Sequence, residues 1–147
     1  MSKGKSFEVK PNGEGGRQYH VNIKGGEIAP VALLPGDPDR IPKITRLWSE
    51  SNEITRHRGY VVHTGRIGAY PVSVCSTGIG APSTAIAIEE LARSGCKALI
   101  RVGSMGAIQR GIRCGELVIA SAAVRLEGCS KQYVSPDYPA AADIHTI

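Results

Sequence analysis

The 147-residue sequence contains few aromatic side chains, which make up 5% of the residues and include one tryptophan and one phenylalanine. Rings therefore contribute little to a core, and we expect small and β-branched residues to fill it. No apolar run approaches the roughly 20 residues that a membrane-spanning helix needs, and the polar residues 1–5 lead into no hydrophobic signal core. We therefore expect a cytoplasmic protein with no membrane partner.

Closely spaced cysteines and dense blocks of one charge are also missing. The four cysteines form no Cys-x-x-Cys pair and have no matching histidine spacing, so we expect no zinc site. Cys75 and Cys96 lie in or beside apolar runs, which favours buried free thiols, although pairing is a spatial question that spacing leaves open. The net charge is +5, but the basic residues are scattered. We therefore expect no nucleic-acid partner.

Glycine is plentiful, and several glycine turns follow short apolar runs that are typical of strands. We expect residues 18–23 to form a short strand or extended arm, with a hairpin-like turn at 65–68. We expect strands at residues 31–34, 53–57, 60–64 and 70–75, from Ala98 onward, and, as a further buried strand, at 117–120 and 122–124. Helical spacing of apolar residues predicts helices over 40–48 and from Pro82 to Ala92.

Strands that alternate with helices indicate one α/β domain with a largely central sheet. We expect residues 1–17 to be a flexible tail and residues 18–147 to belong to the domain. Ligands of such sheets collect at the carboxyl ends of the strands. Glycine turns follow predicted strands at 36–37, 78–80 and 103–106, although the second turn matches neither a Walker loop nor a dinucleotide fingerprint.

Arg101 lies inside an apolar run, where a guanidinium is costly unless something pairs with it. A fixed cation that leads into a hydroxyl-bearing, glycine-flanked turn suits an oxyanion such as phosphate. A structural carboxylate could satisfy the same arginine, and for a lone arginine that is the favoured interpretation. Taken alone, this stretch leaves both interpretations open.

Several segments, taken together and in order, are more specific than any one of them. They are Leu-Leu-Pro-Gly-Asp-Pro-Asp-Arg (33–40), Val-Cys-Ser-Thr-Gly-Ile-Gly-Ala-Pro-Ser (74–83), Glu-Glu-Leu-Ala (89–92), Ile-Arg-Val-Gly-Ser-Met-Gly-Ala (100–107) and Val-Arg-Leu-Glu-Gly-Cys-Ser (124–130). Over residues 20–143 the chain resembles the hexameric nucleoside phosphorylase family, and its uridine phosphorylases most closely. The resemblance implies a three-layer α/β/α domain with a central mixed sheet, truncated at the C-terminus.

The resemblance also implies a pentosyltransferase reaction, in which phosphate attacks the anomeric carbon of a nucleoside and releases the base as ribose 1-phosphate forms. The residues that match the family's phosphate site are Gly36, Arg40, Arg101 and Ser104. Ser104 would also touch the ribose, and Met105 and Gly106 match positions where the family's backbone faces the base. Arg101 and Ser104 would carry the catalysis, with positioning and electrostatics lowering the barrier.

Two further residues match positions that reach into the neighbouring subunit's site. Arg58 would contact the neighbour's phosphate and His20 the neighbour's ribose, so the resemblance implies a homo-oligomer built from dimers, with a hexamer in the family. Gly59 stands where uridine phosphorylases often have a glutamate of a monovalent-cation site. Ile79 and Ser83 match the other positions of that site, but the glycine leaves it without its carboxylate. We expect no cofactor, and phosphate acts as a co-substrate.

Family members continue well past residue 147, and their further part carries the ribose-binding Glu-Met-Glu segment and the base-recognition residues. We therefore expect residues 18–147 to be the phosphate-binding, N-terminal portion of a phosphorylase domain, inactive alone. Because the base-reading residues are absent, a purine nucleoside or methylthioadenosine phosphorylase is the alternative. A catalytically silent phosphate- or nucleoside-binding subunit is the alternative from another class. The arginines at 40, 58 and 101 argue against a nucleosidase, which uses water in place of phosphate.

Overall fold

The computed structural model describes residues 16–147, so the expected flexible tail, residues 1–17, lies almost wholly outside the described residues. At the start of the described chain, Arg17 is held in place. Its guanidinium donates to the two carboxylate oxygens of Glu27 at 2.7 and 3.0 Å, and to the carbonyl of Asn22 at 2.6 Å. Residues 18–23 form turns and irregular structure and not the short strand that was one of the two predictions for them. Val21 and Ile23 are nevertheless fully buried.

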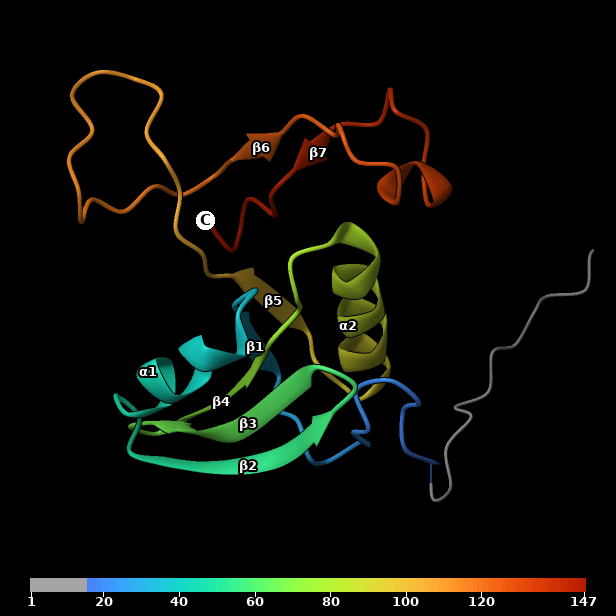
Figure 1. The fold of residues 1–147 in the computed structure, drawn as a ribbon. Coiled ribbons are helices and arrows are strands. Elements are labelled where there is room, and N and C mark those ends of the chain that lie inside the picture. The colour runs from blue at the N-terminus through green and yellow to red at the C-terminus, as the bar shows by residue number, and fades with distance from the viewer. Residues whose placement is uncertain (1–15) are drawn as a thin grey trace, which may run out of the picture.

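A five-stranded mixed sheet forms the centre of the molecule (Figure 1). Its strands are β1 (Val31–Leu34), β2 (Glu50–His57), β3 (Tyr60–Ile67), β4 (Tyr70–Cys75) and β5 (Ala98–Arg101). They lie in the order β2-β3-β4-β1-β5, where β1 is parallel to β4 and β5, and the β2-β3-β4 ladder is antiparallel. These positions confirm the strands expected before residue 102.

The turn between β3 and β4 differs from the expected one. Residues 65–67 continue β3, and the turn itself is confined to Gly68 and Ala69. Gly65 serves a different purpose from a turn glycine. A Cβ at this position would lie 2.0 Å from the carbonyl oxygen of Glu50, so the close approach of β2 requires the glycine.

Helices cover both faces of the sheet, which confirms the three-layer arrangement. On one face, Val61 and Val74 pack with Ile41 of α1 (Ile41–Thr45), which follows the 3₁₀ turn η2 (Pro38–Arg40). On the other, Val62 and Leu91 belong to the larger core that includes α2 (Ala81–Arg93). Neighbouring residues of a strand point to opposite faces, so the two clusters share the same strands. In the described part of the chain, no helix is long and apolar enough to cross a membrane.

The first helix is shorter than the predicted 40–48. The side chain of Asp37 accepts from the N–H of Asp39 and caps η2, and Pro42 stands in the first turn of α1 as expected. After Thr45 the chain tightens, because the N–H groups of Leu47 and Trp48 donate to carbonyls three residues earlier. Leu47 is 77% exposed, so it does not belong to the buried face of a helix. The prediction had counted it as part of that face and therefore made the helix too long.

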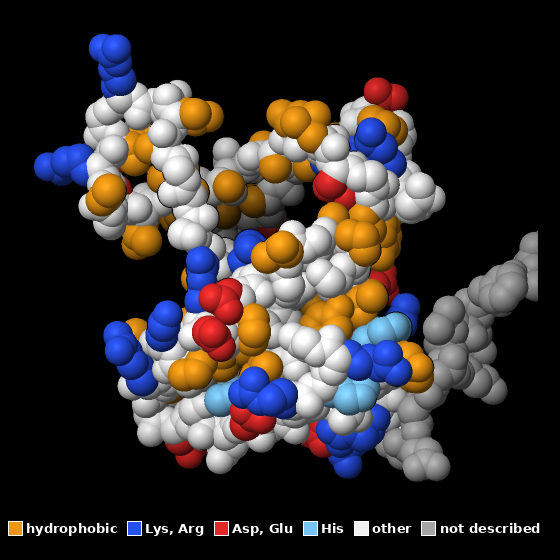
Figure 2. Space-filling view, viewed as in Figure 1, with side chains coloured by type: hydrophobic (Ala, Val, Ile, Leu, Met, Phe, Trp, Pro, Cys, Tyr) orange, Lys and Arg blue, Asp and Glu red, His pale blue; other side chains and the backbone are white. Residues whose placement is uncertain are grey.

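The predicted buried strand at 117–120 and 122–124 is wrong for this structure. Only β6 (Ala122–Ala123) is a strand there, and it pairs with β7 (Ala140–Ala141) apart from the central sheet. Leu117 is 96% exposed and Ile119 is 73% exposed. Residues 102–147 extend beyond β5, the last strand of the sheet, and Figure 2 shows hydrophobic side chains on the surface of this segment. The run is apolar enough for a strand, but no further strand of the described chain pairs with it.

Candidate functional site

The three glycine turns meet at one edge of the sheet, at the carboxyl ends of β1, β4 and β5. The N–H of Val102 donates to the carbonyl of Leu34, which joins the ends of β5 and β1. The N–H of Gly78 donates to the carbonyl of Gly36 at 2.9 Å, which joins the turns after β4 and β1. This edge is where ligands of α/β sheets collect, as the sequence predicts.

Arg101 ends β5 and lies across this edge. Its Nη1 donates to the carbonyls of Leu34 and Val102, each at 2.7 Å. Gly36 allows the close approach, because a Cβ there would lie 3.2 Å from Nη2 of Arg101 and 3.1 Å from the carbonyl oxygen of Gly78. A side chain at position 36 would therefore compete with the guanidinium for space.

Arg40 brings a second guanidinium to the same edge. It is the last residue of η2, and its Nη2 donates to Oγ of Ser104 at 2.9 Å. Ser104 belongs to the turn after β5, where Gly103 would place a Cβ 3.4 Å from Nη1 of Arg101. The structure thus brings together Gly36, Arg40, Arg101 and Ser104, the residues that the resemblance assigns to phosphate.

None of the ion pairs in residues 16–147 involves Arg40 or Arg101. The structural carboxylate that could have explained Arg101 is therefore missing from the described chain. Contrary to the expectation of a guanidinium inside a buried strand, Arg101 is exposed, so solvent and two carbonyl oxygens satisfy it without a carboxylate. Neither Arg40 nor Arg101 has a carboxylate oxygen within 4 Å in residues 16–147. Two guanidiniums and a hydroxyl at one sheet edge suit a multivalent oxyanion.

The residues expected to face the base are not gathered into this cluster. Met105 is 60% exposed, and a Cβ at Gly106 would meet no atom within 4 Å. A cavity of about 740 Å³ lies between α2 and residues 123–133, in the hollow region of Figure 2. Arg101 is one of the residues that line it, together with Ala85 and Ile88 of α2.

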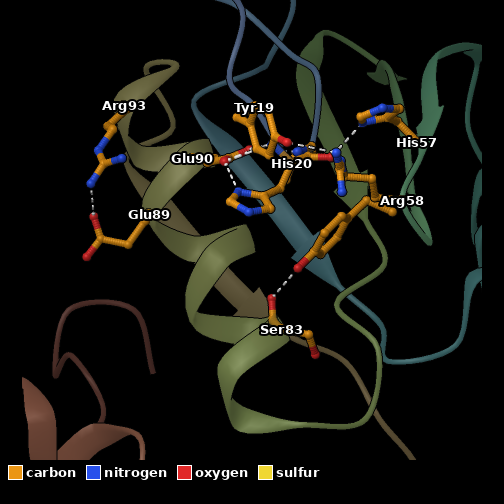
Figure 3. A network of polar contacts seen from close by, with 10 residues as sticks. Tyr19, His20, His57, Arg58, Ser83, Glu89, Glu90 and Arg93 are labelled. Atoms are coloured by element: carbon orange, nitrogen blue, oxygen red, sulfur yellow. Dashed lines mark hydrogen bonds and ion pairs between the residues drawn. The ribbon is translucent and has the colours of Figure 1, made fainter. Parts of the chain in front are cut away.

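Arg58 and His20 form a second cluster that has no hydrogen bond to the first within residues 16–147 (Figure 3). Nη2 of Arg58 donates to the hydroxyl of Tyr19 at 2.9 Å, and the guanidinium lies 4.6 Å from the centre of the Tyr19 ring. Nδ1 of His20 lies 2.7 Å from Oε1 of Glu90, a residue of α2. The two residues that match the neighbour-reaching positions are thus held side by side.

Gly59, where the resemblance implies a glutamate, lies in the turn between β2 and β3. Arg58 has φ of 50° and Gly59 has φ of 86°, and these two residues connect the antiparallel strands β2 and β3. A two-residue hairpin turn with both φ values positive favours glycine at its second position. Position 59 therefore carries no carboxylate. In the described residues, no group of three or more His, Cys, Asp or Glu side chains could hold a metal ion.

Glu90 is a residue that the sequence-based search missed. Its side chain is buried, and it stands on the same stripe of α2 as Ala87 and Leu91, which are fully buried. The signal was available, because position 90 lies three residues after Ala87 on the apolar face of the predicted helix. Burial, followed by the charge of Glu90, raises the pKa of the nearby Cys75 thiol to about 12. Cys75 and Cys96 are both buried and free, as predicted.

Comparisons with known proteins identify the relatives of this chain. The chain is 61% identical to a uridine phosphorylase of Thermococcus kodakarensis over 135 residues, which cover 92% of this chain and 49% of that protein. It is 39% identical to a guanosine phosphorylase of Halorubrum lacusprofundi, over 89% of this chain and 54% of that protein. The chain therefore spans about half the length of these relatives.

A crystal structure of uridine phosphorylase from Vibrio fischeri superposes with a TM-score of 0.84 at 42% identity, over 87% of this chain and 53% of that chain. This match supports the mixed sheet and its two helical layers. The family model described as the Phosphorylase superfamily matches residues 30–146, which include Gly36, Arg40, Arg101 and Ser104. The chain belongs to the phosphorylase superfamily.

Proposed function

We propose that this chain supplies the phosphate-binding half of a nucleoside phosphorylase that acts on uridine. In the reaction, an oxygen of inorganic phosphate forms a bond to C1′ of the ribose. The bond from C1′ to N1 of uracil breaks, and its electron pair leaves with the base, which takes up a proton. The products are uracil and ribose 1-phosphate.

The observation that carries this proposal is the pairing of Arg40 with Ser104 beside Arg101, at a sheet edge with no carboxylate partner in the described chain. Two fixed cations would bind the phosphate and aim one oxygen at C1′. Phosphate is a weak nucleophile that must be desolvated and oriented, so most of the catalytic gain would come from positioning and electrostatics. The Ser104 hydroxyl, which accepts from Arg40 at 2.9 Å, would contact the phosphate that Arg40 binds and the ribose beside it.

Uridine is favoured over a purine nucleoside by the relatives' names. The protein that is 61% identical is a uridine phosphorylase. A purine nucleoside is the second candidate substrate, because the guanosine phosphorylase of Halorubrum lacusprofundi is also 39% identical.

We further propose that the active assembly is at least a dimer. Arg58 and His20 are held by Tyr19 and Glu90 in a cluster of their own, without a bond to Arg101 in the described chain. Such a placement suits residues that complete the site of a neighbouring subunit. A single copy of this chain would then bind phosphate without turning over nucleoside.

Calorimetric titration of inorganic phosphate into the 147-residue chain tests the phosphate site. Arg101→Ala removes charged hydrogen bonds to phosphate worth about 1.5–3 kcal/mol, which corresponds to roughly 10- to 150-fold weaker binding. The matched control is Arg113→Ala, because Arg113 is also an exposed arginine and pairs only with Glu116 among the described carboxylates. The assignment fails if Arg101→Ala and Arg113→Ala leave the same phosphate affinity.

Complementation tests the catalytic part of the proposal. The chain is mixed with a polypeptide that corresponds to the second half of the Thermococcus kodakarensis relative, and phosphate-dependent release of uracil or guanine is measured. We expect uridine cleavage by the mixture and little or none by either part alone. Phosphate binding without any cleavage in the mixture would favour the silent binding subunit. Faster guanosine cleavage would favour the purine alternative.

A further inference from the structure

Glu90 is a buried carboxylate in the cluster that contains the expected site residues His20 and Arg58. Only 5% of the residue is exposed, and its two oxygens accept several hydrogen bonds from the chain before β1. The N–H of Val21 donates to Oε2 at 2.6 Å, and the N–H of His20 lies 3.0 and 3.1 Å from the two oxygens. A buried carboxylate is tolerated only with such a set of donors.

The same carboxylate fixes the imidazole of His20. Nδ1 of His20 lies 2.7 Å from Oε1 of Glu90, and a carboxylate can only accept. Nδ1 must therefore carry the hydrogen, so a neutral His20 has its lone pair on Nε2. No atom of residues 16–147 is hydrogen bonded to that Nε2, and the His20 side chain is 40% exposed. The ring thus presents an acceptor to its surroundings.

Arg58 is joined to this arrangement through Tyr19. The Tyr19 ring meets the His20 ring edge-on, with centres 4.9 Å apart, and its hydroxyl and its face both contact the Arg58 guanidinium. The imidazole of His57 donates from Nδ1 to the carbonyl of His20 at 3.0 Å, which ties the same segment to β2 (Figure 3). A contact chain therefore runs from Glu90 through residues 19–21 to Arg58.

We propose that Glu90 is a positioning residue that holds His20 and Arg58 together as one unit. It sets the Nδ1–H form of His20, which leaves Nε2 to accept a hydrogen bond from a sugar hydroxyl. It also seats Tyr19 where the ring and hydroxyl orient the Arg58 guanidinium. This inference rests on the proposed function, in which both residues act at a neighbouring subunit's site.

Glu89 provides a matched control on the same helix. It is adjacent in sequence, and its carboxylate pairs with Arg93 of α2 at 3.0 Å with both side chains about 40% exposed. Figure 3 shows that this pair is separate from the His20 cluster. Glu89→Gln therefore removes one negative charge from α2 without removing an acceptor of His20.

Nitrogen-15 NMR of the histidine rings in the 147-residue chain tests the proposal without any ligand. At a pH where His20 is neutral, we expect a protonated Nδ1 and an unprotonated Nε2 in the wild type and in Glu89→Gln. Glu90→Gln should lose this signature and shift His20 toward the Nε2–H form. The amide oxygen would turn toward the N–H groups of residues 20 and 21, because the amide nitrogen can only donate. That nitrogen would then face Nδ1 of His20, which would have to accept. The Arg58 side-chain protons should then lose their ring-current shift from Tyr19.

The wild-type measurement alone keeps the proposal testable if Glu90→Gln does not fold, since a predominant Nε2–H form of His20 overturns it. An unchanged His20 tautomer in folded Glu90→Gln also overturns it, as does a change at His20 that leaves Arg58 unaffected. Phosphate plays no part in these spectra. Failure of the Arg101→Ala titration with an intact His20 signature would therefore count against the proposed function alone.

Discussion

Residues 16–101 and residues 102–147 both contain short apolar runs, but only the first region buries its apolar side chains. All the residues of the hydrophobic core lie before position 97, whereas no residue from 102 to 147 is buried. The run at Leu117–Ala120 is as apolar as the run at Val31–Leu34, which forms β1 between two parallel neighbours. An apolar run becomes a buried strand only where another element pairs with it or covers it.

The candidate site lies at the boundary between these two regions, because the residues that we propose bind phosphate come from both. Gly36 and Arg40 belong to the packed region, and Ser104 belongs to the first turn of the exposed region. Arg101, the last residue of β5, joins them. Four predictions test whether the two regions differ in solution as they do in the structure, and they run from the largest expected effect to the smallest.

The largest contrast concerns the cysteines. Burial and the charge of Glu90 raise the pKa of Cys75 from 9.0 to about 12, so below pH 9 its thiolate fraction is roughly a thousandfold smaller. Cys114, in the exposed region, is open to solvent. We expect an aromatic disulfide reagent at pH 8 to modify Cys114 first and Cys75 only after unfolding. Mass spectrometry of the labelled peptides gives the order, and early labelling of Cys75 would contradict the packing described for β4.

Leucine truncation should separate the regions by stability. Leu91 of α2 is fully buried, so Leu91→Ala removes core contacts and leaves a cavity, at a cost of about 2–5 kcal/mol in the free energy of unfolding. Leu117→Ala makes the same chemical change at a side chain that is 96% exposed, and we expect a change within about 0.5 kcal/mol. Urea denaturation measures both. Equal losses would mean that residues 102–147 pack in solution.

Alanine substitutions at two glycines test the proposed phosphate site at the boundary between the two regions. Gly36→Ala would place a methyl group 3.2 Å from Nη2 of Arg101, which displaces the guanidinium, and we expect phosphate affinity to fall about tenfold, or about 1.4 kcal/mol. Gly106→Ala adds the same methyl group where no atom lies within 4 Å, and we expect no change in phosphate affinity. Calorimetric titration of phosphate compares the variants. Equal affinities would separate Gly36 from the phosphate site.

Much of the packed region could be predicted from the sequence, as could the gathering of Gly36, Arg40, Arg101 and Ser104 at one end of the strands. The run Tyr70–Cys75 ends at a glycine turn, and Pro82 stands in the first turn of α2, so local chemistry marks the end of β4 and the start of α2. The residues that we propose bind phosphate were singled out because they follow strand ends in a family order, and their role stays a prediction. Parallel neighbours β1 and β5 then bring Gly36 and Arg101 to one edge.

The errors came from features that depend on partners distant in sequence. The helix after Arg40 ended early because nothing covers Leu47, and the run at 117–120 has no neighbour in the described chain. Glu90 was missed because a carboxylate on an apolar stripe is unfavourable unless donors reach it, and its donors lie 69 and 70 residues earlier in the sequence. Periodicity predicts which side of a helix is buried, but it does not predict which hydrogen-bond donors from the rest of the chain lie against that side.

The smallest contrast concerns one ion pair in each region. Burial of Glu27 opposes its ionisation, but the Arg17 hydrogen bonds, the Lys24 N–H and the charges of both residues outweigh it, so the pKa of Glu27 falls below 4.5. A carboxyl with a lowered pKa in the folded state stabilises the fold above its unfolded pKa and loses that stabilisation as pH falls through the folded value. The pair should therefore contribute fully at pH 7 and vanish in acid.

Arg17→Ala should lower the free energy of unfolding by about 1 kcal/mol at pH 7. The loss should shrink as the pH falls from the unfolded pKa of Glu27 through its lower folded pKa, because the wild type then loses the charge of Glu27. The control is Arg113→Ala, in the exposed region, where the Arg113 side chain is 88% exposed and its pairing with Glu116 competes with water. We expect no measurable change there at either pH. Urea titrations at pH 7 and pH 3 give the four differences. A loss for Arg17→Ala that persists undiminished at pH 3 would assign its effect to the Asn22 carbonyl bond, which does not titrate, and not to the Glu27 charge.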